Sequence, residues 1–150
     1  MEISGYGITI DLPDGWDGII AASSQGLATM HAAKFALPPR DGEFASLAIA
    51  ALPADGVLLV LTEYAPDVAG EGLFAHEGLP TPVPERAFRR RAFTGLQPGR
   101  YGVQRFCTAS ERPFCLYVVV GTQPDPAILV GEANAVLSTV SIQPRVRPGG

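Results

Sequence analysis

The chain has 150 residues, of which 47% are hydrophobic and 17% are charged, and its formal net charge is −4. This composition is typical of a globular chain and excludes an intrinsically disordered one. A mildly acidic protein has no overall attraction for nucleic acid or anionic membranes, so we expect neither as a partner. No hydrophobic run approaches the ~20 residues that span a bilayer, and residues 1–10 lack the features of a signal peptide. These features predict one cytoplasmic domain over residues 1–144, without membrane insertion.

The first third of the chain predicts strands joined by short turns. Residues 6–12 alternate hydrophobic and polar side chains, as in a strand with one buried face. Residues 17–24 and 27–37 predict two further strands, and the Ser-Gln-Gly turn between them favours pairing. The alanines of residues 27–37 also fit a helix, but the short turn before that run and the two prolines after it favour a strand.

The middle of the chain predicts a second hairpin followed by less regular structure. The hydrophobic runs 44–52 and 56–64 are joined by Pro-Ala-Asp-Gly, which is a strong turn signal. Asp67 is a suitable cap for a short helix over residues 68–76, although two glycines weaken that helix. Residues 87–94 alternate imperfectly and predict a strand with a bulge.

Residues 101–121 contain both cysteines and predict the central hairpin of the sheet. The runs 102–108 and 114–120 are rich in β-branched and aromatic residues. Residues 109–113 separate them and predict a loop of three to five residues. The sequence LYVVV in the second run is hydrophobic at every position, which indicates a central strand that is covered on both faces.

The register of this hairpin decides which side chains share a face. A register symmetric about Glu111 would place Cys107 opposite Cys115. Because alternate residues of a strand share a face, Phe106 and Leu116 would then lie together on the more hydrophobic face. We assign that face to the core.

The C-terminal part of the chain predicts the longer of two helices. Asp125 followed by Pro126 combines an N-cap with a proline at the first helical position. Hydrophobic residues form a helical stripe over residues 127–140, and residues 141–143 predict a short strand before a disordered tail at 145–150. The fold class is therefore α+β: an antiparallel sheet with hairpins, packed by one short helix and one longer C-terminal helix.

One stretch also resembles known families. The sequence YGITIDLPDGW, residues 6–16, has the form aromatic-Gly-x-x-x-x-hydrophobic-Pro-x-x-Trp. It resembles the opening of the PsbP-like and Mog-type α/β/α sandwich families, in which hairpins follow this turn and a helix closes the domain. The chain also resembles short uncharacterised actinobacterial proteins, and the resemblance covers residues 6–142. It implies the sandwich fold and an accessory or binding role, and it identifies no site residue.

Two cysteines and two histidines are the candidates for metal binding or thiol chemistry. Cys107 and Cys115 predict buried thiols, because free cysteine is among the most buried residue types. A cross-strand disulfide and a zinc site with His31 and His76 are the alternatives. The sequence contains neither a Gly-x-Ser-x-Gly elbow nor a phosphate-binding glycine loop. We therefore expect no cofactor, and a metal- or cysteine-dependent enzyme is the least favoured hypothesis.

The most prominent charge feature is a group of arginines interleaved with phenylalanine, Arg86, Arg89, Arg90 and Arg91, which is followed along the chain by Arg100 and Arg105. Guanidinium groups suit carboxylates and phosphates, so this group is a candidate for binding an acidic partner. The alternative, which we favour, is a solvated strand edge that its charges protect from aggregation. Trp16, the only tryptophan, either packs against the core or adds to a binding surface.

The functional hypothesis from sequence is a non-catalytic accessory domain that binds a protein partner through a sheet face or through the arginine group, with Trp16 as a further candidate. The alternative is a domain for a small apolar ligand, with a pocket between sheet and C-terminal helix that is lined by Phe106, Leu116 and Leu137. The runs 44–52 and 56–64 are hydrophobic enough to predict an exposed patch, and with it a homodimer.

Overall fold

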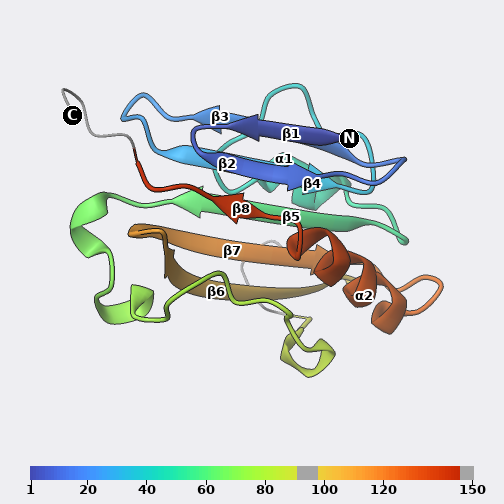
Figure 1. Cartoon of the computed structure of the whole chain (residues 1–150). Coiled ribbons are helices and arrows are strands. Elements are labelled where there is room, and N and C mark those ends of the chain that lie inside the picture. The colour runs from blue at the N-terminus through green and yellow to red at the C-terminus, as the bar shows by residue number, and fades with distance from the viewer. Residues whose placement is uncertain (91–97, 146–150) are drawn as a thin grey trace.

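The computed structural model describes residues 1–90 and 98–145 and shows a mixed α+β fold (Figure 1). The strands within these residues are β1 (Glu2–Gly5), β2 (Ile8–Asp11), β3 (Asp17–Ala22), β4 (Ala28–Ala33), β5 (Val57–Glu63), β6 (Tyr101–Ala109), β7 (Arg112–Val120) and β8 (Ser141–Ile142). The helices are α1 (Ser46–Ala51) and α2 (Pro126–Leu137), with three short 3₁₀ turns, η1 (Pro66–Val68), η2 (Gly72–Phe74) and η3 (Glu85–Ala87). None of the helices formed by the described residues has the length and hydrophobicity needed to cross a membrane.

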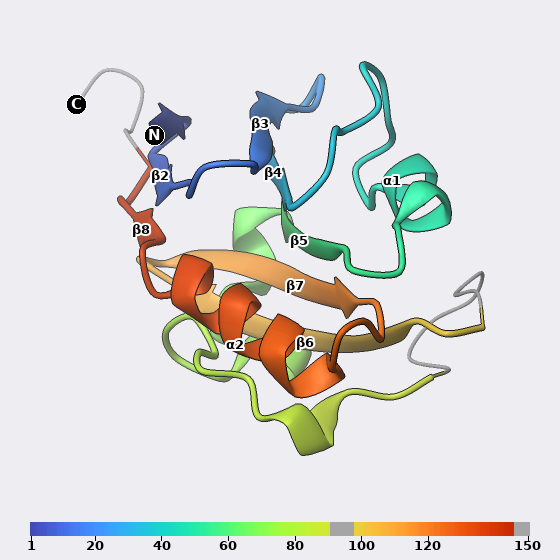
Figure 2. The same cartoon turned by 90° about the vertical axis from the view of Figure 1, so that its right-hand side faces the viewer.

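The strands form two antiparallel sheets that pack in layers. The larger sheet has the order β3-β4-β5-β7-β6 and the smaller one the order β1-β2-β8. The smaller sheet and α2 lie on one face of the larger sheet, whereas α1 lies on the other (Figures 1 and 2). The expected α+β class is therefore confirmed, and the closing C-terminal helix is present.

The main core lies between the larger sheet and the layer formed by α2 and the smaller sheet. Its largest fully buried side chains come from both layers: Ile8, Ile10, Met30, Leu59, Leu61, Phe114, Leu116, Leu129 and Leu137. A second, smaller cluster lies under α1 and includes Ala48, Leu52, Leu58, Val60 and Val119. Strand β5 is buried at every residue, and β7 at all but Tyr117, so the expectation of a central strand covered on both faces is confirmed for β7.

Local signals explain how α2 forms. The Asp125 side chain accepts a hydrogen bond from the Ala127 amide at 2.9 Å, and Pro126 occupies the first turn, as expected. After the helix ends, β8 pairs with β2, which confirms the short strand expected at residues 141–143. The helix thus carries the chain back to the N-terminal hairpin.

The expected hairpin of residues 44–64 is wrong in its first half. Residues 46–51 form helix α1, and β5 pairs with β4 and β7 instead. The Asp41 carboxylate accepts hydrogen bonds from the amides of Leu47 and Ala48, at 3.1 and 2.9 Å, which satisfies donors at the start of the helix. Alanine is the best helix former, and this alanine-rich run follows that preference. Because β5 lies buried in the middle of the sheet, it contributes no exposed hydrophobic patch for a dimer.

The register of the β6–β7 hairpin differs from the expected one by one position. Ser110 and Glu111 have φ values of 51° and 65°, so they form a tight two-residue turn in place of a longer loop. Cys107 consequently lies opposite Phe114, and Phe106 lies opposite Cys115. A shift of one residue moves side chains to the other face, so the two cysteines lie on opposite faces of the sheet.

Two further segments differ from the sequence expectation. Residues 68–76 do not form a helix, because η1 and η2 are separate 3₁₀ turns there. Residues 87–90 contain the end of η3 and a single bridge between Arg89 and Gly102, and residues 91–94 of the expected strand lie outside the described residues. Strand β1 was not predicted from the sequence. It pairs with β2 through a turn at Tyr6 and Gly7, both with positive φ.

A buried ionic network joins β5, β7 and the C-terminal end of the described chain. The Glu63 carboxylate, with a fully buried side chain, accepts hydrogen bonds from Arg112 at 2.9 and 3.1 Å and from Arg145 at 2.8 Å. It also accepts one from the Ala28 amide at 2.9 Å. Arg145, expected in a disordered tail, is therefore bound to the sheet, while residues 146–150 lie outside the described residues.

Candidate functional site

An irregular segment runs along the outer edge of β6, which is an edge strand of the larger sheet. We call this segment, residues 76–89, the strap. It is tied to α2, because the Asn134 side chain accepts a hydrogen bond from the Val83 amide and donates one to the Val83 carbonyl, both at 2.8 Å. Val83 itself is buried in the main core. The strap is thus fixed at its middle to the helix layer, not to β6.

The strap is also fixed to β6 at both of its ends. At one end, Thr108 donates its amide to the His76 carbonyl and accepts from the Gly78 amide, both at 2.8 Å. At the other end, Arg89 and Gly102 exchange two backbone hydrogen bonds of 2.9 Å. Between these two anchor points the strap turns away from the strand and leaves part of the edge open.

The open part of the edge contains Gln104 and Phe106. In an antiparallel strand the backbone groups of alternate residues point to the same side, and Gly102 and Thr108 point outward to the strap. The amides and carbonyls of Gln104 and Phe106 therefore point outward as well. Among residues 1–90 and 98–145, nothing makes a hydrogen bond to these backbone groups. We call this stretch, residues 104–106, the window.

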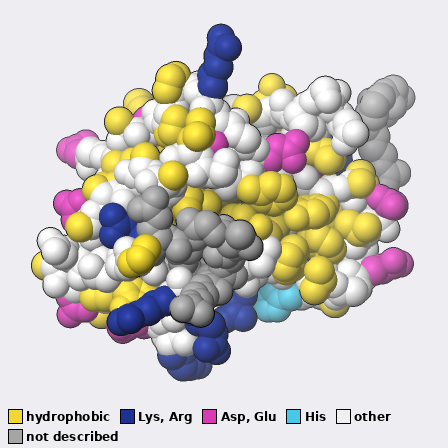
Figure 3. Space-filling view, turned by 180° about the vertical axis from the view of Figure 1, so that it is seen from behind, with side chains coloured by type: hydrophobic (Ala, Val, Ile, Leu, Met, Phe, Trp, Pro, Cys, Tyr) yellow, Lys and Arg dark blue, Asp and Glu magenta, His cyan; other side chains and the backbone are white. Residues whose placement is uncertain are grey.

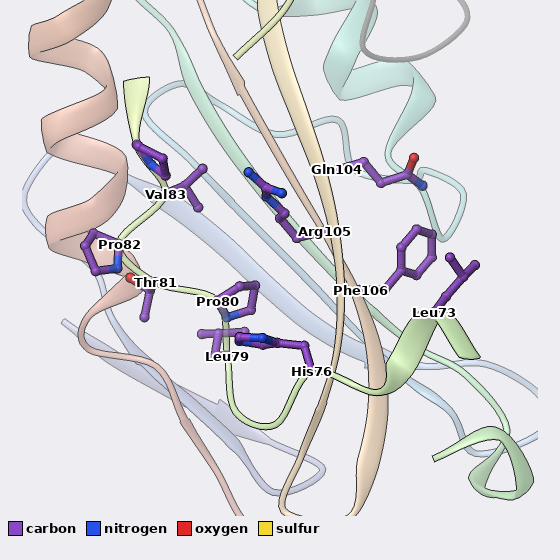
Figure 4. A pocket seen from close by; sticks show the side chains of 11 residues that line it. Leu73, His76, Leu79, Pro80, Thr81, Pro82, Val83, Gln104, Arg105 and Phe106 are labelled. Atoms are coloured by element: carbon purple, nitrogen blue, oxygen red, sulfur yellow. The ribbon is translucent and has the colours of Figure 1, made fainter. Parts of the chain in front are cut away.

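The window opens into a groove with a volume of about 540 Å³, which we call the edge groove. Strap residues and η2 form its walls, and the window forms its floor (Figure 4). Figure 4 shows that Arg105 points toward the strap side, whereas Gln104 and Phe106 point to the opposite side, toward Leu73. The groove thus has two walls of different chemistry, one on each side of the strand.

One wall is hydrophobic and well supported. Phe106 packs edge-on against Phe74, with ring centroids 5.4 Å apart, and Tyr64 contacts both rings. The Thr108 hydroxyl donates to the Phe74 carbonyl at 2.7 Å, which holds η2 against the end of β6. Leu73 extends from this support and is 68% exposed. This wall therefore offers hydrophobic contact area to an occupant of the groove.

The other wall combines strap residues with the charged side chain of Arg105. Arg105 is exposed and makes no hydrogen bond or ion pair with any residue that the structure describes. Arg86 and Arg89 are exposed at the end of the strap. Arg90 lies over the Tyr101 ring, with its guanidinium carbon 5.5 Å from the centroid. Of the predicted arginine group, Arg86, Arg89 and Arg90 follow the groove-lining part of the strap and do not line the edge groove, and Arg91 falls outside the described residues.

The molecular surface on the side of α1 shows how these features are distributed. Seen from behind, hydrophobic side chains form a patch, and arginine or lysine side chains gather along the lower border of this view (Figure 3). The exposed hydrophobic residues that belong to this side include Phe44, whose ring lies 5.7 Å from that of Tyr117. Charge and hydrophobic area therefore lie close together on this surface.

Trp16 does not contribute to the edge groove. It is half-buried and packs against the main core, beneath the turn that follows β2. It precedes β3, which forms the edge of the larger sheet farthest from β6. The structure thus places Trp16 and the arginine group at separate sites.

The two cysteines and two histidines are not brought together. Cys107 and Cys115 are free and buried, and burial raises the pKa of Cys107 to about 12 and that of Cys115 to about 11. His31 lies in β4 with a ring nitrogen 3.3 Å from the Glu43 carbonyl, whereas His76 is exposed in the strap. Among the described residues, no group of three or more His, Cys, Asp or Glu side chains is placed to hold a metal ion.

The expected pocket under the C-terminal helix takes a different form. Leu116 and Leu137 pack in the main core, while Phe106 lies on the other face because of the shifted register. A smaller cavity of about 230 Å³ lies at the N-terminal end of α2. Its lining includes Phe88, Tyr101, Val120, Pro126 and Val130.

Sequence reasoning missed the edge groove. The local signal was weak: a proline-rich loop followed by an edge strand with an arginine in its middle. Comparison with known proteins adds no assignment, since no family model matches the chain and no curated protein or solved structure is significantly similar to it. The function must therefore be argued from the groove itself.

Proposed function

We propose that the chain is a non-catalytic binding domain that holds a segment of another protein in the edge groove. The observation that carries this proposal is the window, where the outward backbone groups of Gln104 and Phe106 lack partners among the described residues. Open strand edges bind extended segments of other chains, because the segment supplies the missing hydrogen bonds. The groove also offers a hydrophobic wall and, on the other side, the Arg105 guanidinium group, and such features are usual sources of affinity and selectivity.

The state of the thiols favours binding over thiol catalysis. A nucleophilic cysteine needs a lowered pKa and access to solvent. Burial raises the pKa of Cys107 to about 12 and that of Cys115 to about 11, so the reactive thiolate is scarce at neutral pH. Both thiols behave as small hydrophobic side chains of the two sheet faces.

A selection experiment tests the proposal. The full chain is immobilised and used to select from a phage-displayed library of random octapeptides, and the enriched peptides are synthesised. We expect their titration into ¹⁵N-labelled protein to shift the amide resonances of Gln104, Phe106 and Leu73. Peptides that bind elsewhere, or a library from which nothing is enriched, would contradict the proposal.

A second candidate function is the binding of a small apolar molecule at the N-terminal end of α2. The cavity there favours it, because its lining is mainly hydrophobic and Glu85 is the one charged residue among the described residues that line it. Its volume of about 230 Å³ lies below the ~300–1,000 Å³ of most small-molecule sites, so only a small ligand would fit. Val130→Trp would fill this cavity, and a ligand bound there should be lost while octapeptide binding to the edge groove persists.

A further inference from the structure

The edge groove also indicates which class of segment it holds, an inference that rests on the proposed function. We propose that the occupant is an extended segment of a different protein that adds to β6 as a short strand. In this arrangement a hydrophobic-acidic-hydrophobic sequence of the segment lies along the window, and its acidic side chain contacts Arg105.

The backbone geometry defines the length of the paired region. Gln104 and Phe106 are two residues apart, and an extended chain presents its own amide and carbonyl groups at the same spacing. Alternate residues of the segment can therefore pair with Gln104 and Phe106. Because the strap already pairs with Gly102 and Thr108, the window admits only three residues of the segment in the sheet plane.

The pleat of the strand decides where each side chain of the segment points. Residues that pair with Gln104 and Phe106 carry their side chains on the same face as these two. On that face they meet the Phe106 ring and Leu73, so hydrophobic side chains suit both positions. The residue between them points to the other face, where Arg105 extends toward the strap (Figure 4). The central position of the segment therefore faces a guanidinium group.

The charge at this position favours an acidic residue. No described carboxylate lies within ion-pair distance of Arg105, although the structure contains ion pairs elsewhere, such as Lys34 with Glu132 at 2.9 Å. An acidic side chain placed beside Arg105 would form the ion pair that this arginine lacks. Arg86 and Arg89 do not line the groove, so the charge that an occupant meets in the window is that of Arg105.

The same charge disfavours a second copy of this chain as the occupant. Antiparallel pairing of two windows would place Arg105 directly beside Arg105 of a second copy. Like charges that face each other across two strands are destabilising. The residue that selects an acidic segment thus also opposes self-association through this edge.

Two synthetic peptides test the charge assignment. Acetyl-Ser-Val-Glu-Val-Ser-amide and its variant with lysine at the centre are titrated into the ¹⁵N-labelled full chain. We expect the glutamate peptide to bind about fivefold more tightly, since a favourable cross-strand charge pair contributes up to about that factor. Arg105→Glu should reverse the preference, whereas Arg40→Glu, the same change at an exposed arginine in the loop before α1, should leave it unchanged.

A second pair of variants tests the strand pairing. Gln104→Pro removes one outward amide donor and leaves the hydrogen bonds to β7 intact, because the backbone of residue 104 points away from β7. Gln104→Ala removes the same side chain but keeps the amide. We expect the proline variant to bind the glutamate peptide about fivefold more weakly than the alanine variant, because that factor corresponds to the loss of about one hydrogen bond.

The outcomes separate the two proposals. If no selected octapeptide shifts the window resonances, the proposed function and this inference both fail. If octapeptides bind in the edge groove but show no acidic preference, or if Arg105→Glu leaves selection unchanged, only the inference fails. If light scattering shows a dimer that Gln104→Pro dissociates and Gln104→Ala does not, the occupant is a second copy and the inference is overturned.

Discussion

Strands β6 and β7 are equal in length and pair along their whole extent, yet their surroundings differ. Strand β7 has a neighbour on each side and is buried at eight of its nine positions. Strand β6 has a full neighbour on one side only, and its middle residues Gln104 and Arg105 are exposed. Position in the sheet therefore decides how far each strand is buried, and under the proposed function it separates a strand that stabilises the fold from one that binds. Substitutions should therefore separate these two properties, and the predictions below test that separation.

The largest effect should come from the charged end of β7. Arg112→Ala removes the main partner of Glu63 and leaves a buried carboxylate with fewer hydrogen bonds, so we expect a loss of ~3–5 kcal/mol in the free energy of unfolding. Urea denaturation followed by circular dichroism measures it. As a control, Arg145→Ala removes a partner that is 35% exposed and should cost about 1 kcal/mol or less. Equal losses in the two variants would contradict this account of the network.

The second largest loss of stability is expected at Phe114, which can be compared with Phe106 on the neighbouring strand. Phe114 on β7 is fully buried, so Phe114→Ala should destabilise the fold by ~3–5 kcal/mol through lost burial and the cavity left behind. Phe106 on β6 is only half-buried, and Phe106→Ala should cost ~1–2 kcal/mol. The same urea titrations apply. A larger loss for Phe106→Ala would mean that β6 supports the core as much as β7 does.

A pH dependence should arise from the same network. Burial alone would raise the pKa of Glu63, but hydrogen bonds from Arg112, Arg145 and the Ala28 amide outweigh it and lower the pKa below the ordinary value of 4.5. A lowered folded-state pKa stabilises the fold above pH 4.5, and this stabilisation is lost as the pH falls through the folded-state value. Urea midpoints measured between pH 6 and 3 should fall with pH. Glu63→Gln should be less stable at pH 6 and show a shallower decline, and an unchanged slope would argue against the network as the source.

The smallest effect on stability should come from proline in the window. Gln104→Pro breaks no hydrogen bond to β7, so we expect it to lower the free energy of unfolding by about 1 kcal/mol or less, as proline is tolerated at sheet edges. Leu116→Pro, on β7, would disrupt a strand with neighbours on both sides and should cost ~3 kcal/mol or more. Thermal melting of both variants provides the comparison. A large drop in the melting temperature of Gln104→Pro would show that the outward amide of residue 104 already has a hydrogen-bond partner within the protein.

The sequence predicted the parts of the fold that depend on local patterns. Alternation identified β2, a continuous hydrophobic run identified β7, and Asp125 with Pro126 marked the start of α2. It missed α1, because the short, alanine-rich and largely hydrophobic run over residues 46–51 fits a buried strand as well as a helix. It also missed the hairpin register, since Ser110 and Glu111 adopt positive φ without the glycine or asparagine that usually indicates such a turn.

The candidate site was less predictable than the fold, for a physical reason. The edge groove depends on where the strap leaves β6, and tertiary contacts such as Asn134 with Val83 decide that position. Residues 51 positions apart make these contacts, and no local pattern reports them. The arginine group was visible in the sequence, and Arg105 was noted as following it, but no local pattern indicated that Arg105 lies in an open window of an edge strand.

The pairing of β8 with β2 has a consequence for the order in which the fold is completed. Ile8, in the β1–β2 hairpin, pairs with Ile142, so the small sheet gains its third strand only after residue 142 has left the ribosome. Until then the β1–β2 hairpin has a free edge at β2, whereas the neighbours of β3 to β7 have all been synthesised. During synthesis the free edge of β2 is therefore open to wrong pairing until β8 covers it.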